Sequence, residues 1–164
     1  MVDDRAAELG RKYLTLGLGE LAAAAVFVMV AFTLAARLNE PGEQKALWSA
    51  LIPLLMILVQ GGGYWLSART WIGRPPMPRT LARIYRGFRI TDIALLAAGL
   101  AGIVAWWPDR LGPALLAVAV WGFGVVEYLN YFHVRLSYPP RRWLTTVHQW
   151  RTPRLIQDLR AAAR

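Results

Sequence analysis

Four long apolar runs constrain this chain more than any other feature. They cover residues 13–36, 46–66, 90–107 and 114–132 of a 164-residue chain whose mean hydropathy is +0.33. A helix needs about 20 apolar residues to cross the hydrocarbon core of a bilayer, and it satisfies its own backbone polar groups there. The sequence therefore predicts an all-α membrane protein with four transmembrane helices packed as an antiparallel bundle. The first run is too long for the core of a signal peptide, so we expect it to be retained.

The distribution of positive charge predicts how these helices are oriented. The chain has 19 Lys and Arg and a net charge of +9, and all of these residues except Arg37, Lys45 and Arg110 lie on one side of the predicted topology. By the positive-inside rule, both termini and the loop between the second and third runs are cytoplasmic. No nucleic-acid-binding motif accompanies the charge, so we expect anionic lipid and not nucleic acid as its partner. The chain has no cysteine, which excludes disulfides and thiolate ligands.

The segments outside the runs divide the chain into two parts. We expect residues 1–134 to form the transmembrane domain and residues 135–164 a basic cytoplasmic tail, whose last residues form a short amphipathic helix. Residues 1–12 are expected to form a short surface helix. An amphipathic, arginine-rich segment precedes the third run, and we expect it to lie at the interface and to continue into that span. Its arginines are candidate contacts for anionic headgroups or a phosphate: Arg79, Arg83, Arg86 and Arg89.

Small residues indicate where helices can approach closely. Gly61, Gly62 and Gly63 interrupt the second run, downstream of Pro53, which should kink it. In the third run small side chains recur every four residues. We therefore expect the face that carries Ala94, Ala98 and Gly102 to be buried against another helix.

Polar side chains within the apolar runs gather near their cytoplasmic ends. Each helix contributes at least one of them to roughly one layer, and such groups are expensive inside a membrane. These residues are our candidates for binding a ligand or an ion: Glu20, Gln60, Asp92, Glu127, Asn130 and His133. We expect Glu127 to carry any function that the layer has.

Two interpretations of this layer stay open. The first is structural: the polar groups bond one another across helices, and Arg69 and Arg89 neutralise the carboxylates. The second is a site for a cation, with carboxylates and one imidazole as donors. The spacing Asn130-x-x-His133 occurs once, whereas a di-metal bundle uses two Glu-x-x-His motifs, so we assign no metal. No catalytic motif is present, and the sequence assigns neither a catalytic residue nor a cofactor.

Three classes of function follow, in order of preference. The first is a non-catalytic interaction, accessory or regulatory module, a homo-oligomer or the partner of another membrane protein. The second is a cation- or proton-linked carrier or channel that uses Glu20, Asp92 and Glu127. The third is an intramembrane enzyme acting on a phosphate-bearing lipid, with Glu127 or His133 as the base. The excess of arginine over lysine is typical of GC-rich bacterial genomes, so we expect a bacterial inner-membrane protein.

Overall fold

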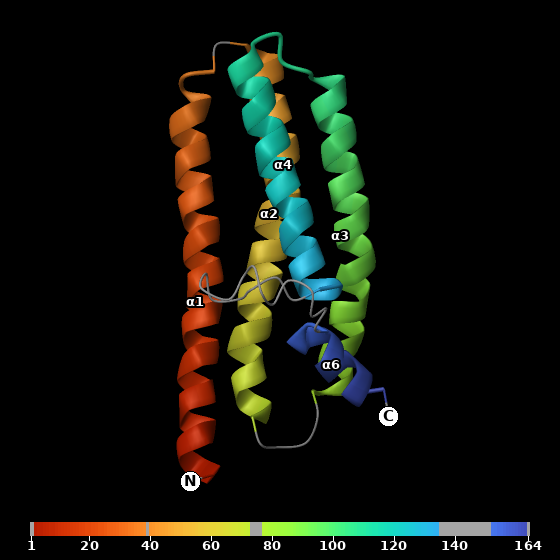
Figure 1. Ribbon diagram of the computed structural model, residues 1–164. Coiled ribbons are helices and arrows are strands. Elements are labelled where there is room, and N and C mark those ends of the chain that lie inside the picture. The colour runs from red at the N-terminus through yellow and green to blue at the C-terminus, as the bar shows by residue number, and fades with distance from the viewer. Residues whose placement is uncertain (1, 39, 73–76, 135–151, 164) are drawn as a thin grey trace, which may run out of the picture.

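The computed structural model describes residues 2–38, 40–72, 77–134 and 152–163. These described residues form helices and contain no strand. The elements are α1 (Val2–Ala35), α2 (Pro41–Ala68), the short 3-10 helix η1 (Arg69–Trp71), α3 (Arg79–Ala105), α4 (Leu111–Phe132) and α6 (Arg154–Ala161), as Figure 1 shows.

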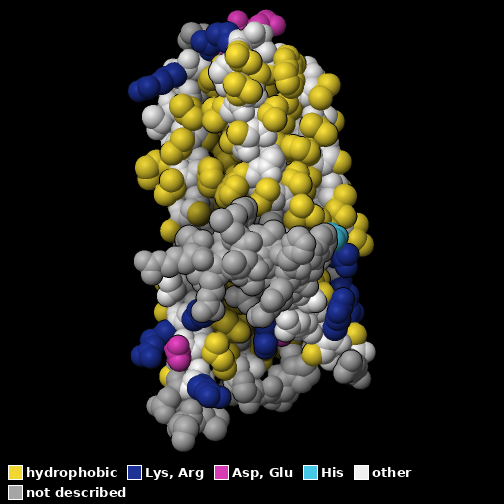
Figure 2. Space-filling model, viewed as in Figure 1, with side chains coloured by type: hydrophobic (Ala, Val, Ile, Leu, Met, Phe, Trp, Pro, Cys, Tyr) yellow, Lys and Arg dark blue, Asp and Glu magenta, His cyan; other side chains and the backbone are white. Residues whose placement is uncertain are grey.

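Four of these helices are long and apolar enough to cross a membrane, which confirms the predicted helical fold with four candidate spans. Figure 1 shows them running up and down beside one another. The N-terminus, the C-terminus and α6 lie at one end, which we call the terminal end. The connections from α1 to α2 and from α3 to α4 lie at the opposite end, the loop end. Figure 2 shows apolar side chains over the half near the loop end, and Lys and Arg side chains towards both ends.

The helices extend beyond the apolar runs, because hydropathy marks the stretch that suits lipid and not the stretch that is helical. Helix α1 begins at Val2, so residues 2–12 continue the first span and do not form a separate helix. Helix α2 begins at Pro41, a residue suited to a first helical position because its missing N–H is not needed there. The arginine-rich segment is the first part of α3, which runs without a break into the third span, as predicted.

Helix α2 is the centre of the fold. In its most apolar stretch 61% of the residues are buried, against 11% for α1 and 22% for α3 and for α4. Helices α1, α3 and α4 all pack against α2. The arrangement is therefore three helices around a central one, and most of the outer surface of these three is left apolar and exposed, as lipid requires.

Glycines set the contacts between α1 and α2. A Cβ added to Gly17 would lie 3.0 Å from the Gly62 carbonyl oxygen, and one added to Gly62 would lie 3.1 Å from the Gly17 carbonyl oxygen. Side chains at either position would push the two backbones apart. The close approach expected at the glycines of the second run is therefore present.

The predicted packing face of α3 is wrong. Ala94 and Ala98 are exposed. The face that meets α2 instead carries Asp92, Leu96, Gly99 and Ile103, all buried and spaced as one helical stripe. Gly102 lies at its edge and contacts Ser49. This orientation brings Gly99, which has no side chain, against the Ser49 backbone, and it buries the Asp92 carboxyl group in the core.

The chain returns to the terminal end through α6. This helix packs against α3 and α4, with Leu155, Ile156 and Leu159 buried. The short amphipathic helix expected near the C-terminus is thus present, and its apolar face lies on the bundle. Residues 135–151 of the predicted tail lie outside the described residues, and the division into domain and tail stays a prediction.

Candidate functional site

A hydrogen-bonded centre at the terminal half joins α1, α2 and α4. The Tyr131 hydroxyl, in the last turn of α4, donates to Glu20 Oε1 of α1 over 2.7 Å. The same hydroxyl accepts a hydrogen bond of 3.2 Å from Trp65 Nε1 of α2. The Tyr131 ring lies over Gly61, where a Cβ would overlap it. Gly61 therefore lets the tyrosine cross α2 and reach the carboxyl group of α1.

Glu20 and Glu127 line one open groove between α1 and α4. The groove has a volume of about 270 Å³, and Leu58 of α2 also lines it. Its other lining residues are mostly small or apolar: Thr15, Leu16, Gly19, Ala23, Phe27 and Phe123. The rings of Phe27 and Phe123, 5.8 Å apart, bound the groove on the side towards the loop end. The groove thus combines an apolar, aromatic wall with two acidic groups.

The two acids have polar neighbours but no cationic one within the described residues. Glu20 is held by Tyr131, and Glu127 by the Asn130 side chain. Both side chains are half-buried, and both line the same groove. The arginine partners expected for the layer are not found there, since none of the described arginines forms an ion pair with Glu20, Asp92 or Glu127. A positive charge in the groove would lie near both carboxyl groups.

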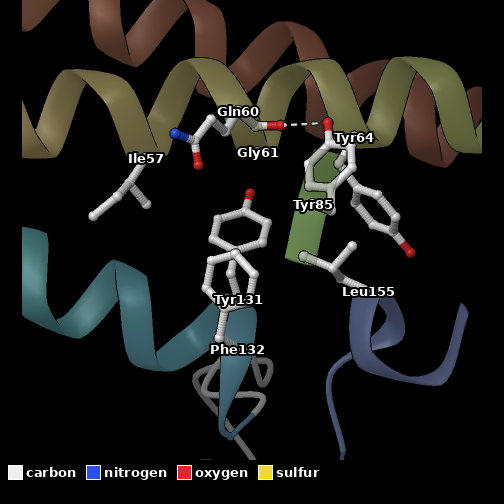
Figure 3. Close-up of a pocket in the computed structure, with 8 residues that line it drawn as sticks. All are labelled: Ile57, Gln60, Gly61, Tyr64, Tyr85, Tyr131, Phe132 and Leu155. Carbon is white, nitrogen blue, oxygen red and sulfur yellow. Dashed lines mark hydrogen bonds between the residues drawn. The ribbon is translucent and has the colours of Figure 1, made fainter. Parts of the chain in front are cut away.

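A second polar contact lies between α2 and α3. Gln60 Nε2 donates to Asp92 Oδ1 over 2.9 Å, and both side chains are buried. The Tyr85 hydroxyl donates to the Gln60 backbone carbonyl over 3.0 Å. Beside this contact is a small cavity, drawn in Figure 3, which Tyr131 and Leu155 also line. Tyr131 thus lies between the cavity on one side and Glu20 on the other.

A third centre, which the sequence did not predict, fixes α6. Asp158 Oδ2 accepts hydrogen bonds from the Tyr64 hydroxyl, over 2.8 Å, and from Trp71 Nε1, over 3.1 Å. Arg154 of the same helix pairs with Asp158 Oδ1 over 3.1 Å. In the sequence Asp158 is one acid in a charged tail, and only its place between Leu155, Ile156 and Leu159 on a helical face hinted at burial.

The predicted layer is thus divided between two places. Glu20, Glu127 and Asn130 belong to the groove, whereas Gln60 and Asp92 face each other on another side of α2. His133 follows the end of α4, is exposed, and contacts the Tyr128 ring. Within the described part of the chain, no three Asp, Glu, His or Cys side chains are grouped so as to hold a metal ion.

The arginines of the first part of α3 are exposed. Arg79, Arg83, Arg86 and Arg89 all point away from the core, and Arg86 Nη2 donates to the Leu159 carbonyl of α6 over 3.3 Å. Their predicted contact with anionic headgroups stays a prediction. Sequence reasoning missed the donors that hold the acids, Tyr64, Trp71 and Tyr131, and it missed Trp65, which donates to the Tyr131 hydroxyl. Their aromatic character indicated only a membrane interface.

Comparison with known proteins finds no match to this chain. No protein-family model matches the chain, and neither a curated protein nor a solved structure matches it. The groove and the buried acid–amide contact are therefore the features on which a function can be based.

Proposed function

We propose that this protein is a non-enzymatic membrane protein that binds a small organic cation in the groove between α1 and α4. The observation that carries the proposal is that Glu20 and Glu127, from different helices, line one open groove with apolar and aromatic walls. Carboxylates attract a positive charge, and the apolar wall favours a ligand with an apolar body. Phe27 and Phe123 also present ring faces or edges that suit a quaternary ammonium group and its substituents.

The size of the groove limits the ligand class. Ligand pockets for drug-sized molecules span about 300–1,000 Å³, so a groove of about 270 Å³ suits a small ligand with about one ring. A lipid-facing groove also suits a ligand that reaches its site through the membrane. Binding of this kind is the first step required of a carrier, the second class that the sequence indicated.

The other two classes gain less support. An enzyme that uses Glu127 or His133 as a base would need these residues beside an arginine clamp. His133 is exposed and is not among the groove residues, and the arginines of α3 are exposed on another helix. An interaction module would be favoured by a closed layer in which every polar group is satisfied, whereas this layer opens into a groove at Glu20 and Glu127.

The test is direct binding of benzyltrimethylammonium to the purified protein, measured by isothermal titration calorimetry in detergent. This ion carries a permanent charge, so its own protonation does not complicate the result. We expect saturable binding by the wild type, weakened about tenfold by Glu20→Gln or Glu127→Gln, which corresponds to about 1.4 kcal/mol. The double variant should show no binding. Neopentylbenzene, the uncharged molecule of the same shape, should bind weakly or not at all.

Glu8→Gln is the matched control, because Glu8 is an exposed acid of α1 outside the groove. It should bind like the wild type, and circular dichroism should show that all variants keep their helices. If the wild type does not bind the ion, or if both Gln variants bind it unchanged, the cation-binding proposal is wrong. The interaction-module hypothesis would then be the better explanation.

We propose further that the terminal end is cytoplasmic, in a bacterial inner membrane. The uneven distribution of the 19 Lys and Arg supports this orientation. Single cysteines placed at Asp109 or near Glu43, at the exposed Glu40, should react with a membrane-impermeant maleimide added to whole cells. Cysteines at Gln157 or near Met77, at the exposed Thr80, should react only after lysis. The opposite labelling pattern would invert the topology and place the groove nearer the outer surface.

A further inference from the structure

The contact between Gln60 and Asp92 is the most completely buried polar pair between two of the long helices. Asp92 has an exposed fraction of 0% and Gln60 one of 8%. The 2.9 Å bond from Gln60 Nε2 to Asp92 Oδ1 uses one oxygen of the acid and the amide nitrogen. Within the described residues this is the only hydrogen bond that the Asp92 carboxyl group makes, and no cationic side chain pairs with it.

Two buried oxygens of this pair have no hydrogen-bond partner among the described residues. They are Asp92 Oδ2 and Gln60 Oε1. An ionised carboxylate and an amide oxygen are both acceptors only, so neither can satisfy the other. A protonated carboxyl group carries one O–H donor in addition. An acid and a primary amide can then join through two antiparallel hydrogen bonds, and the two unpartnered oxygens are the atoms that the second bond would join.

We propose that Asp92 is a proton-binding site, in which a proton taken up from water forms an O–H bond at Asp92 Oδ2 that donates to Gln60 Oε1. Uptake of one proton converts the buried carboxylate into a neutral acid and gives both unpartnered oxygens a partner. The donor set favours a proton over a metal ion. One carboxylate and one amide oxygen fall far short of the six to eight oxygens that Ca²⁺ takes.

The surroundings limit the access of water to the pair and place it close to the groove. Figure 3 shows the Gln60 side chain beside a small cavity, with Tyr131 facing it and Leu155 of α6 on the far side. The cavity, of about 10 Å³, has room for about one water molecule. The Tyr131 hydroxyl donates a hydrogen bond to Glu20 of the groove, and its ring lines the cavity beside Gln60. The Tyr131 side chain thus lies between the groove and the Gln60–Asp92 pair.

This proximity makes the proton and the organic cation linked ligands, an extension that rests on the proposed function. A positive charge in the groove attracts the ionised Asp92 carboxylate but not the neutral acid. It therefore favours loss of the proton from Asp92. By linkage, loss of the proton must strengthen binding of the cation by the same factor. The helices packed around the level of Asp92 carry further titratable or charged side chains: Glu20 on α1, Tyr64 on α2, Tyr85, Arg86 and Arg89 on α3, Glu127, Tyr128 and Tyr131 on α4, and Arg154, Asp158 and Arg160 on α6.

Infrared spectroscopy of the full chain in lipid tests the proton site without any ligand. A protonated carboxyl group has a C=O stretch that a carboxylate lacks. At about pH 5 the wild type should show this band, Asp92→Asn should lose its Asp92 component, and Asp109→Asn, at an exposed acid of the α3–α4 connection, should not change it. Gln60→Leu should shift the band, because the acid loses its partner. An identical spectrum for wild type and Asp92→Asn would overturn the proposal.

A stability comparison gives an independent result. The amide that Asp92→Asn introduces can make both hydrogen bonds to Gln60 that the neutral acid makes, so this variant should melt at the wild-type temperature. Asp92→Leu should melt lower, because the Gln60 amide then lacks any partner. If Asp92→Asn melts as low as Asp92→Leu, the ionised form is the native one and the proposal is wrong.

Calorimetry with benzyltrimethylammonium separates this proposal from the proposed function. Across about pH 5 to 9, wild-type affinity should rise with pH more steeply than that of Asp92→Asn, whose site cannot lose a proton. Band loss in Asp92→Asn with no binding of the ion would uphold the proton site and refute the cation groove. Binding of the ion with no Asp92 band would uphold the groove and refute the proton site.

Discussion

The two halves of the bundle are built differently, although the same four helices run through both. In the half near the loop end, the core consists of alanines and aliphatic side chains, including Ala46, Ala50, Leu51 and Ile103. The buried acid of that half, Glu43, pairs with Arg110 at the end of the bundle. In the terminal half, the core is rich in tyrosine and tryptophan, and their polar atoms bond to the buried Asp158, to the half-buried Glu20 or to one another. The two halves are therefore held together by different interactions.

Apolar surface gives helices little reason to associate inside a membrane, because lipid tails are apolar too. The loop half therefore depends on close packing of small residues, such as Gly99 against Ser49. The terminal half uses several hydrogen bonds to hold carboxyl groups in place. A purely structural bundle could repeat the packing of the loop half throughout. The two halves should therefore respond differently to substitution.

The largest effect is expected from Asp158→Ala in the terminal half. This change leaves the Tyr64 hydroxyl and Trp71 Nε1 as buried donors without an acceptor, at about 1–3 kcal/mol each. Helix α6 should detach from the bundle, and limited trypsin digestion should then cleave it rapidly. Asp158→Asn keeps an acceptor oxygen and should be milder. Gln157→Ala, at an exposed position of the same helix, is the control. Slow cleavage of Asp158→Ala would mean that the apolar face alone holds α6.

In the loop half, we expect substitutions to destabilise the fold through steric overlap between helices. A Cβ at Gly99 would lie 2.6 Å from the Ser49 carbonyl oxygen, and backbone cannot move aside as a side chain can. We expect Gly99→Ala to lower the free energy of unfolding by about 1–3 kcal/mol, measured by thermal or denaturant unfolding in detergent. Ala98→Leu, one residue away on an exposed face, should change it by less than about 0.5 kcal/mol. The reverse order would show that α3 packs through the alanine stripe.

Sequence reasoning predicted the helices far better than their faces. Run length and polarity are local properties, so the four spans, the continuous arginine-rich start of α3 and the helix near the C-terminus could all be predicted. The rotation of α3 about its axis is not local. Two small-residue stripes were available there, and Gly99 rather than Ala98 meets α2, because that choice also buries Asp92 against Gln60.

The polar site was predicted in part for the same reason. An acid inside an apolar run is costly wherever it occurs, so Glu20, Asp92 and Glu127 could be found from the sequence. Which acids share a site depends on how helices are arranged around α2. The expected arginine partners are replaced by aromatic donors such as Tyr131, whose crossing over Gly61 no spacing rule indicates.

Apart from the control variants, Gly61→Ala should have the smallest effect on stability. It separates the role of Tyr131 in the fold from its role at the groove. A Cβ at Gly61 overlaps the Tyr131 ring, which is a side chain and can turn away. The lost bonds to Glu20 and from Trp65 cost about 0.5–1.5 kcal/mol each, and replacing a helical glycine by alanine returns about 0.5–1 kcal/mol, so the net loss should be at most about 2.5 kcal/mol. Gly122→Ala, where a Cβ meets nothing within 4 Å, should only stabilise. Gly61→Ala should nevertheless change the affinity for benzyltrimethylammonium, measured by calorimetry, as Tyr131→Phe does. Both variants remove the hydrogen bond that Tyr131 donates to Glu20. Unchanged binding in both variants would mean that Tyr131 supports the fold and leaves the groove unaffected.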